Sequence, residues 1–346
     1  MSIVSPTRGT HPRPAQVTAT ARRRPLTRVV VPLLLVAVVA ALGPVLLSGY
    51  WTKIVTLSAV YAAVAAGTGL LYGRLGFVSL NQIALVGIGG WVFLRTAHLV
   101  ALPSPILLLV AGAVACAVGT VIGLPSLRLS GLALALVTLM AAGAFEVVFY
   151  GIGFPDGGSG PSGKATGSEV PSALPRPSFA TSDAAMFRYT VVVVAVLFLV
   201  LWLVLGGRAG RAWAAIRQSE AGANATGVAV TRYRLLALAL TSFTTGVAGA
   251  LLASGTGRLD PISFPAQQSI VLFAVVLIGG AFSLAGAVLA GVLYVVLPAA
   301  LTDLGVNSNL VLVIFGAGLV HALVTAPEGI AGQVAALARR LRGRSA

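Results

Sequence analysis

The longest uncharged run in the chain limits its fold more than any other feature. Residues 269–302 include no Asp, Glu, Lys or Arg, and most of them are apolar. A helix needs about 20 apolar residues to cross the hydrocarbon of a bilayer, so this run is too long for one crossing and short for two. It predicts either two spans that break near Gly279, Gly280 and Ser283, or a re-entrant segment followed by a span. In both cases the run belongs in a membrane.

Apolar runs of spanning length recur along the rest of the chain. They cover residues 29–49, 54–73, 75–94, 99–124, 129–149, 189–207, 235–257 and about 305–326. Only 9% of the residues are charged, against about 25% in a soluble domain, so too few charges remain to cover a water-facing surface. We therefore predict an all-α, polytopic transmembrane helical bundle of about 10 spans (8–10). A soluble enzyme, a disordered chain and a fibrous protein are excluded.

The basic residues indicate how the spans are oriented. The chain has 23 Lys and Arg against 8 Asp and Glu, in short clusters between the apolar runs. With a cytoplasmic N-terminus and every span crossing, 17 basic residues fall inside and six outside, as the positive-inside rule requires. We predict basic cytoplasmic tails at 1–28 and 327–346 around a membrane domain at 29–326. Loop 150–188 is then extracytoplasmic and loop 208–234 cytoplasmic. Nucleic-acid binding is excluded, because no aromatic residues interleave the basic clusters.

The N-terminal basic cluster also fits the start of a secretory signal peptide. Arg22, Arg23 and Arg24 precede an apolar run. That run exceeds the usual length of about 7–15 residues, and no clear small-x-small cleavage site closes it. We expect the first span to be retained.

No catalytic or metal-binding constellation is visible in the sequence. Residues 158–164 nearly spell a phosphate-binding loop, but Ala165 stands where a Ser or Thr would hold magnesium, and no strand precedes it. We interpret this stretch as a flexible loop and expect no enzyme activity, cofactor or metal in the chain. His11, His98 and His321 have no Cys, Asp or Glu at ligand spacing. His321 lies in a predicted span, where it is either a proton relay or a packed side chain.

Polar residues at membrane depth predict where a solute passes. The stretch GRLGFVSLNQ holds two glycines and three polar side chains, namely Gly73, Gly76, Ser79, Asn81 and Gln82. Such a segment interrupts a helix and exposes backbone groups, which a membrane tolerates only where the segment lines a cavity or is buried in protein. Thr138 adds a neutral polar group from another span. A path of neutral groups suits a small zwitterionic or uncharged solute better than an ion.

Glu146 is the one acid deep in an apolar run, near the outer end of the predicted span at 129–149. A charge at the bilayer centre costs roughly 2.5–3.5 kcal/mol on insertion scales, and less near the interface. Glu146 therefore either lines the pathway or its outer vestibule, or is an interfacial residue wetted by loop 150–188.

The two long hydrophilic loops differ in kind. Loop 150–188 is rich in Gly, Pro and Ser, whereas loop 208–234 is basic and has a helical pattern through Arg211–Glu220. A long, basic, helical loop on the cytoplasmic side of a transport protein is a candidate docking element for a soluble partner. The alternative is an amphipathic loop that faces lipid headgroups.

Four stretches together resemble the permease subunits of branched-chain amino-acid ABC importers, most closely their LivM-like half. GRLGFVSLNQIALVGIGG (73–90) is similar to the family's Gly-x-x-Gly-x-x-Ser-Leu-Gly pattern, with Asn81 in place of the last glycine, and LRLSGLALALVTL (127–139) matches along its length. The most specific stretch, 207–253, includes the loop by which such permeases engage their ATPases. The fourth is 261–291. The resemblance covers about residues 45–335.

The resemblance implies a transport subunit without its own ATPase site, in a prokaryotic plasma membrane. The implied partners are a second homologous permease subunit, two ATP-binding-cassette ATPase subunits that bind ATP and magnesium, an extracytoplasmic solute-binding protein and membrane lipids. The implied substrate is a branched-chain or other hydrophobic amino acid, with urea or short amides as the alternative. An ion-coupled secondary transporter is a further alternative, but only Glu146 and His321 are available as coupling groups. A membrane-embedded enzyme would need a catalytic set that is not visible.

The resemblance also implies which residues couple the chain to an ATPase. Glu220, Ala223 and Gly227 match the family's loop, while Gly222 and Asn224 depart from the expected alanine and acid. A short helix here would lie in a groove of the ATPase.

The side chains of that helix then have predicted roles. We expect Arg211 and Arg217 to contact acidic rims of the groove, and Trp213 and Ile216 to fill an apolar pocket in it.

Overall fold

The computed structural model describes residues 27–126, 129, 131–166, 169–305, 310, 313–314, 316–318, 320 and 329–334. Its main helices are α1 (Thr27–Leu46), α2 (Gly49–Leu70) with a π-helical continuation η1 (Leu71–Leu75), α3 (Gln82–Leu99), α4 (Ser104–Ser126), α5 (Gly131–Ile152), α6 (Asp183–Gly206), α7 (Arg208–Gln218), α8 (Glu220–Ala225), α9 (Val230–Thr256), a 3-10 turn η2 (Pro261–Ser263), α10 (Gln267–Gly279) and α11 (Leu284–Asp303). The described residues contain no strand, which confirms the predicted all-α class.

Seven helical segments among the described residues are long and apolar enough to cross a membrane, namely Gly49–Leu75, Ser104–Pro125, Gly131–Ile152, Asp183–Gly206, Val230–Thr256, Pro261–Gly279 and Leu284–Asp303. The predicted polytopic bundle is therefore confirmed, but the predicted count of about ten is not reached. The span predicted at 75–94 is interrupted, because residues 76–81 form no helix and α3 begins only at Gln82. Most of the span predicted at 305–326, including His321, lies outside the described residues, as do most of the two predicted tails.

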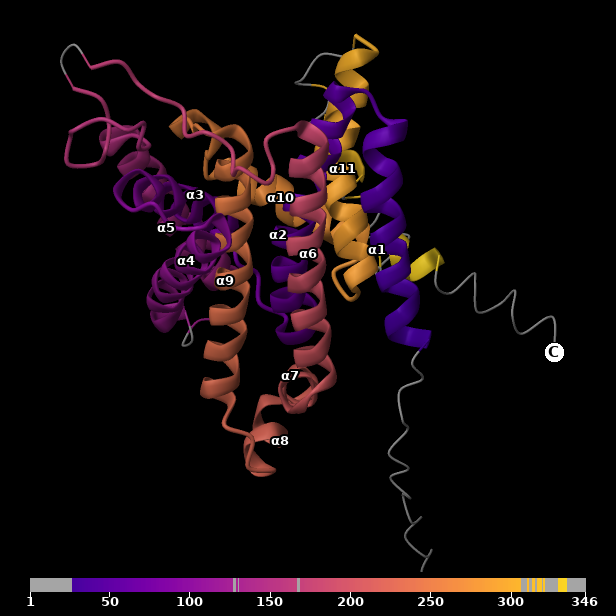
Figure 1. Ribbon diagram of the computed structural model, residues 1–346. Helices are drawn as coiled ribbons and strands as arrows, with labels where there is room; N and C mark the ends of the chain where they lie inside the picture. The colour runs from indigo at the N-terminus through magenta and orange to yellow at the C-terminus, as the bar shows by residue number, and fades with distance from the viewer. Residues whose placement is uncertain are drawn as a thin grey trace, which may run out of the picture.

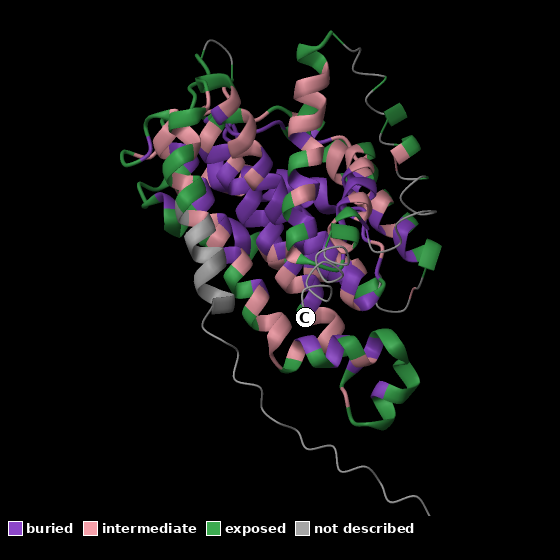
Figure 2. Ribbon diagram, turned by 90° about the vertical axis from the view of Figure 1, so that its right-hand side faces the viewer, coloured by how far each residue is buried: buried purple, intermediate pink, exposed green. Residues whose placement is uncertain are grey.

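Helix α2 forms the axis of the bundle (Figure 1). It packs against α9, α11 and α6, and nearly every residue from Ser58 to Leu70 is buried. Helices α3, α4 and α5 lie to one side of α9, and α1 packs on α6 at the other edge (Figure 1). Figure 2 shows the buried residues concentrated along this axis and the exposed residues around it.

Glycines allow the central helices to approach backbone to backbone. A Cβ atom added to Gly89 of α3 would clash with the carbonyl oxygen of Gly246 in α9. A Cβ atom added to Gly249 of α9 would clash with the carbonyl oxygen of Val86 in α3. Close approach of this kind drives helix association in lipid, because lipid is as apolar as the side chains and burial alone contributes little.

The uncharged run at 269–302 breaks where the sequence predicts a break. Gly280 has a φ of 115°, a conformation that glycine adopts readily and other residues rarely do. Helix α11 begins where Ser283 Oγ accepts a hydrogen bond from Gly286 N at 3.0 Å. Helix α10 has 13 residues, or about 20 Å at 1.5 Å per residue. Helix α10 is thus too short to cross the membrane alone. Together with η2 it forms the segment Pro261–Gly279, which is long enough.

The loop between α5 and α6 carries more internal hydrogen bonds than a flexible loop would. Glu169 Oε2 accepts from Ser159 N at 3.1 Å and from Thr166 N at 2.9 Å, and Asp156 Oδ1 accepts from Ala165 N at 2.6 Å. Hydrogen bonds from Ser159 and Thr166 lower the pKa of Glu169 from 4.5 to about 2, so this carboxylate is ionised at neutral pH. The prediction of a flexible loop at 158–164 is therefore corrected, because internal hydrogen bonds hold this loop.

Helix α6 begins earlier than hydropathy predicts. Ser182 Oγ accepts a hydrogen bond from Ala185 N at 3.2 Å, and Asp183 in the first turn pairs with Arg176 at 2.7 Å and Lys53 at 3.5 Å. A capping serine and an acid in the first turn favour a helix start. The span predicted at 189–207 therefore lacks the polar first turn of α6, which begins at Asp183.

Candidate functional site

The chain between α6 and α9 forms two short helices, α7 and α8, at one end of the bundle, and the α5–α6 loop lies at the opposite end (Figure 1). Helix α8 begins where Ser219 Oγ accepts a hydrogen bond from Gly222 N at 3.1 Å. It ends where Val228 N donates to Ala223 O at 3.0 Å, with Gly227 at a φ of 80°. These local caps shape the loop as two helices followed by a sharp turn at Gly227. The helical pattern of the sequence predicts helix in this loop.

The apolar side chains of α7 point into this chain. Trp213 is 0% exposed, and its indole Nε1–H donates to Tyr233 O at 2.8 Å in the first turn of α9. Ile216 is 5% exposed. The prediction that these two residues fill an apolar pocket of an ATPase is therefore wrong, since both are buried within this chain. They attach α7 to the bundle instead.

Arg217 links α7 to the end of η1 and to the α10–α11 junction at the surface of the bundle. Its Nη1 donates to Tyr72 O and to Gly73 O, the latter at 2.6 Å, in the last turn that continues α2. Its guanidinium carbon also lies 5.0 Å from the ring centroid of Phe282, in the junction between α10 and α11. A cation is favoured at helix carbonyl ends and over an aromatic ring. Arg217 thus makes these contacts within its own chain, and its contact with an acidic rim of an ATPase stays a prediction.

The remaining predicted coupling residues lie on or under the exposed surface of the loop. Arg211 is exposed, and Glu220 pairs with Arg234 at 2.6 Å. Ala223 is 3% exposed, and α8 contacts α7 and α9. Gly227 has open space around it, so its positive φ, not its small size, requires glycine there.

Four of the predicted path residues meet in one buried cluster. Ser79 Oγ donates to Asn81 Oδ1 at 2.8 Å, and Gln82 Oε1 accepts from Thr245 Oγ1 at 2.8 Å. Thr138 Oγ1 accepts a hydrogen bond from the backbone N–H of Leu80 at 3.0 Å. The cavity beside these groups measures about 10 Å³, which holds at most one water molecule. The polar groups satisfy one another, and the chain is closed at this point.

The other three predicted path residues lie outside this cluster. Glu146 Oε2 accepts a hydrogen bond from Ala266 N at 2.8 Å at the start of α10, where the helix dipole favours a negative charge. Glu146 therefore caps a helix, which was not among its predicted roles. Gly73 is buried so close to Ala281 O that a Cβ would clash. Gly76 is exposed and ends η1 with a φ of 74°.

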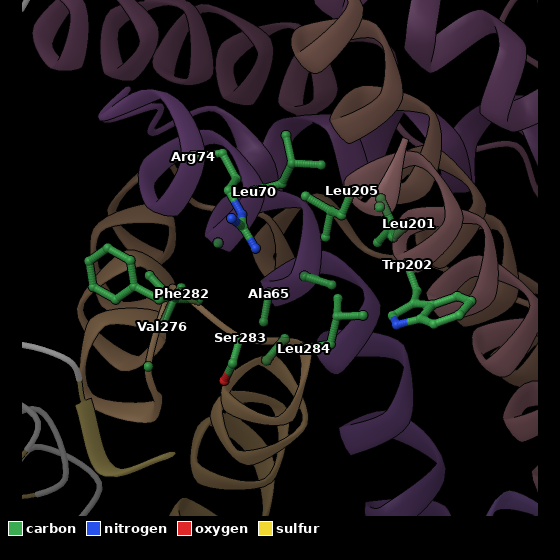
Figure 3. Close-up of a pocket in the computed structure, with 16 residues that line it drawn as sticks. Ala65, Leu70, Arg74, Leu201, Trp202, Leu205, Val276, Phe282, Ser283 and Leu284 are labelled. Atoms are coloured by element: carbon green, nitrogen blue, oxygen red, sulfur yellow. The ribbon is translucent and has the colours of Figure 1, made fainter. Parts of the chain in front are cut away.

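A cavity of about 440 Å³ opens beside the end of η1, within the range of about 300–1,000 Å³ typical of small-molecule sites. Its walls come from α2 and η1, from the last turns of α6 and from the α10–α11 junction (Figure 3). Arg74 is the one charged residue among the described residues of its lining, and the side chain points into the space (Figure 3). Sequence reasoning missed this site because it joins segments far apart in the chain, most of whose residues are small and apolar.

The family of the chain follows from a match over most of its length. Residues 50–323 match the family described as "Branched-chain amino acid transport system / permease component". The chain belongs to this family. The match extends from α2 through α11, so this permease has the axis, the α7–α8 loop and the cavity within the region shared by the family. The match and the seven spanning helices make this permease a multi-pass protein of the cell membrane.

Curated relatives agree with this membership. This permease is 30% identical over 319 residues to the "High-affinity branched-chain amino acid transport system permease protein LivM" of Salmonella typhimurium, an alignment that covers 86% of this chain and 74% of the relative. It is 29% identical over 314 residues to the protein of the same description in Escherichia coli K12, covering 85% and 72%. No solved structure matches this permease.

Proposed function

We propose that this permease is a transmembrane subunit of an ATP-binding-cassette importer for branched-chain or other hydrophobic amino acids. The observation that carries the proposal is the α7–α8 loop, which exposes α8 and is attached to the membrane helices through Trp213 and Arg217. A rigid attachment of this kind is what a soluble motor needs in order to move the spans. The description of the family supports the substrate class.

The proposed orientation has both termini in the cytoplasm, α7 and α8 on the cytoplasmic side and the α5–α6 loop outside. Arg208, Arg211 and Arg232 are all exposed around the α7–α8 loop, and basic residues are retained on the cytoplasmic side of membrane proteins. The position of the two loops at opposite ends of the bundle supports this orientation (Figure 1).

The proposed assembly contains a second homologous permease subunit, two ATPase subunits, and an extracytoplasmic solute-binding protein that delivers the solute. The ATPases hold ATP and magnesium, and this chain contributes no ATPase site or cofactor of its own. Exposed small residues on α8, such as Ala221 and Gly222, support close docking of a protein surface. Large apolar residues exposed on α5, such as Leu132 and Met140 at 75% each, support contact with lipid or another membrane subunit.

In the proposed cycle, ATP binding closes the ATPase dimer and displaces α8 and α7 as one body. The buried Trp213 carries the displacement to the start of α9. Arg217 carries it to η1 and to the α10–α11 junction. Because these two segments form walls of the 440 Å³ cavity, the displacement changes access to that cavity, and hydrolysis resets the cycle.

Uptake of radiolabelled leucine tests the proposed substrate class. Deleting the gene for this chain should remove a saturable, ATP-dependent component of uptake, and its reintroduction should restore that component. Excess isoleucine or valine should compete, because they share the backbone groups and an aliphatic body, whereas urea and acetamide should not. Competition by the amides alone would favour the urea or short-amide alternative. Uptake that continues without ATP and responds to ionophores would favour secondary transport.

A further inference from the structure

The cavity contains a charge, that of Arg74, which no described residue pairs. Of the residues that the structure describes, no Asp or Glu lines the cavity, and the three ion pairs among them do not include Arg74. Most of the lining is small or apolar, with Ala65, Ala66, Gly69 and Leu284 among it. An arginine keeps its charge in proteins, and a charge in apolar surroundings is normally paired. The cavity therefore has the chemistry of a site for an anion.

The α10–α11 junction places the first turn of a helix at the same cavity. Ser283 and Leu284, where α11 begins, both line it. The first-turn N–H groups of a helix have no partner within the helix. Of those in α11, the N–H of Gly286 donates to Ser283 Oγ. Discontinuous membrane helices of transporters present such ends to the anionic groups of their substrates. The junction and Arg74 thus face one space from two sides.

The size and lining of the cavity suit an anion with a small aliphatic body. Its volume of about 440 Å³ exceeds what a bare inorganic ion needs. Leu70, Leu201 and Ala287 supply apolar wall to the same cavity, and a guanidinium binds a carboxylate through two parallel hydrogen bonds. An amino acid with an aliphatic side chain satisfies both halves of this environment.

We propose that the cavity binds the carboxylate of the amino acid in transit, with Arg74 as its anchor. This inference rests on the proposed function, which takes the substrate to be an amino acid. Arg74 follows Gly73, whose carbonyl accepts from Arg217, and Phe282 both lines the cavity and lies under Arg217. A displacement of α7 therefore moves two walls of the site, which couples release of the substrate to the ATPase cycle.

Protection of a cysteine in the cavity tests the proposal in the complete transporter. Cys116, the one cysteine of the chain, is replaced by alanine, and Leu284→Cys supplies the reporter for a membrane-permeable maleimide. L-Leucine should slow labelling, whereas leucinol, which has the same aliphatic body without the carboxylate, should not. Val288→Cys is the matched control, because Val288 is 49% exposed on the same helix and does not line the cavity. Its labelling should not respond to leucine.

Variants of Arg74 identify the anchor. In the Leu284→Cys background, Arg74→Gln should raise the half-protecting leucine concentration about tenfold or more, as expected for the loss of a charged hydrogen bond. Arg74→Lys should restore part of the protection, because it retains the charge without the planar fork. Protection that Arg74→Gln leaves unchanged would overturn the assignment of Arg74.

Two further outcomes would overturn the site itself. Labelling slowed by phosphatidylglycerol vesicles but not by leucine would mean that the anion is a lipid phosphate. Labelling that responds to neither would mean that the cavity binds no such anion. ATP-driven leucine uptake by the Cys116→Ala parent is measured in parallel. Uptake without protection refutes this inference alone, whereas absence of ATP-driven uptake refutes the proposed function.

Discussion

Replacing Arg217 with alanine is expected to lower ATP-driven uptake at least about tenfold while the chain still assembles in the membrane. The substitution removes the donors for Tyr72 O and Gly73 O, and a hydrogen bond from a charged group contributes about 1.5–3 kcal/mol. Trp213 still attaches α7 to α9, so the fold should survive. Movement of α7 would no longer reach η1 and the α10–α11 junction. Parallel assays in proteoliposomes should show continued ATP hydrolysis but less leucine moved per ATP.

Two other arginine variants make this result specific. Arg208→Ala removes an exposed arginine from the same helix and should leave uptake near the wild-type rate. Arg217→Lys keeps the charge but not the fork of donors and should give an intermediate ratio of uptake to hydrolysis. An equal fall in hydrolysis and uptake in Arg217→Ala would show that Arg217 serves docking alone. A wild-type ratio would remove it from the coupling route.

Replacing Gly249 with alanine is expected to lower the stability of the folded chain. The added Cβ would clash with the Val86 carbonyl oxygen, and a backbone atom cannot turn aside as a flexible side chain can. Helices α3 and α9 must then separate, and overpacking of this kind costs typically about 1–3 kcal/mol, occasionally more. Thermal challenge in mild detergent, followed by size-exclusion chromatography, should show a lower unfolding midpoint and much less monodisperse protein.

Gly143→Ala is the matched control for that experiment. Gly143 lies within α5 and has no atom within 4 Å of an added Cβ. The substitution should leave stability unchanged or slightly raised, because alanine favours a helix over glycine by about 1 kcal/mol. Equal stability of the two variants would show that close contact between α3 and α9 is not needed.

Length and hydropathy predict the elements that depend on local chemistry. The break in the run at 269–302 follows from Gly280 and Ser283, which end one helix and cap the next. The polar cluster of Ser79, Asn81 and Gln82 is predicted because polar groups at membrane depth must be buried together. Their burial is confirmed, and the structure adds a hydrogen bond between Ser79 and Asn81, but the small space beside them does not make an open path.

The features that sequence reasoning could not predict depend on which surfaces meet. The pattern of α7 indicates an amphipathic helix, but not that Trp213 faces its own chain instead of a partner. The role of Glu146 depends on α10, which lies 120 residues away in the chain. The cavity at Arg74 exists only once α2, α6 and the α10–α11 junction are packed together.

Purification of this chain from native membranes in mild detergent, with mass spectrometry of the proteins that accompany it, tests the central claim most directly. The account predicts recovery of two ATP-binding-cassette ATPases and a second permease, and leucine transport by the reconstituted complex that requires ATP and the solute-binding protein. A chain that purifies alone, and moves solute in liposomes without ATP, would contradict the account.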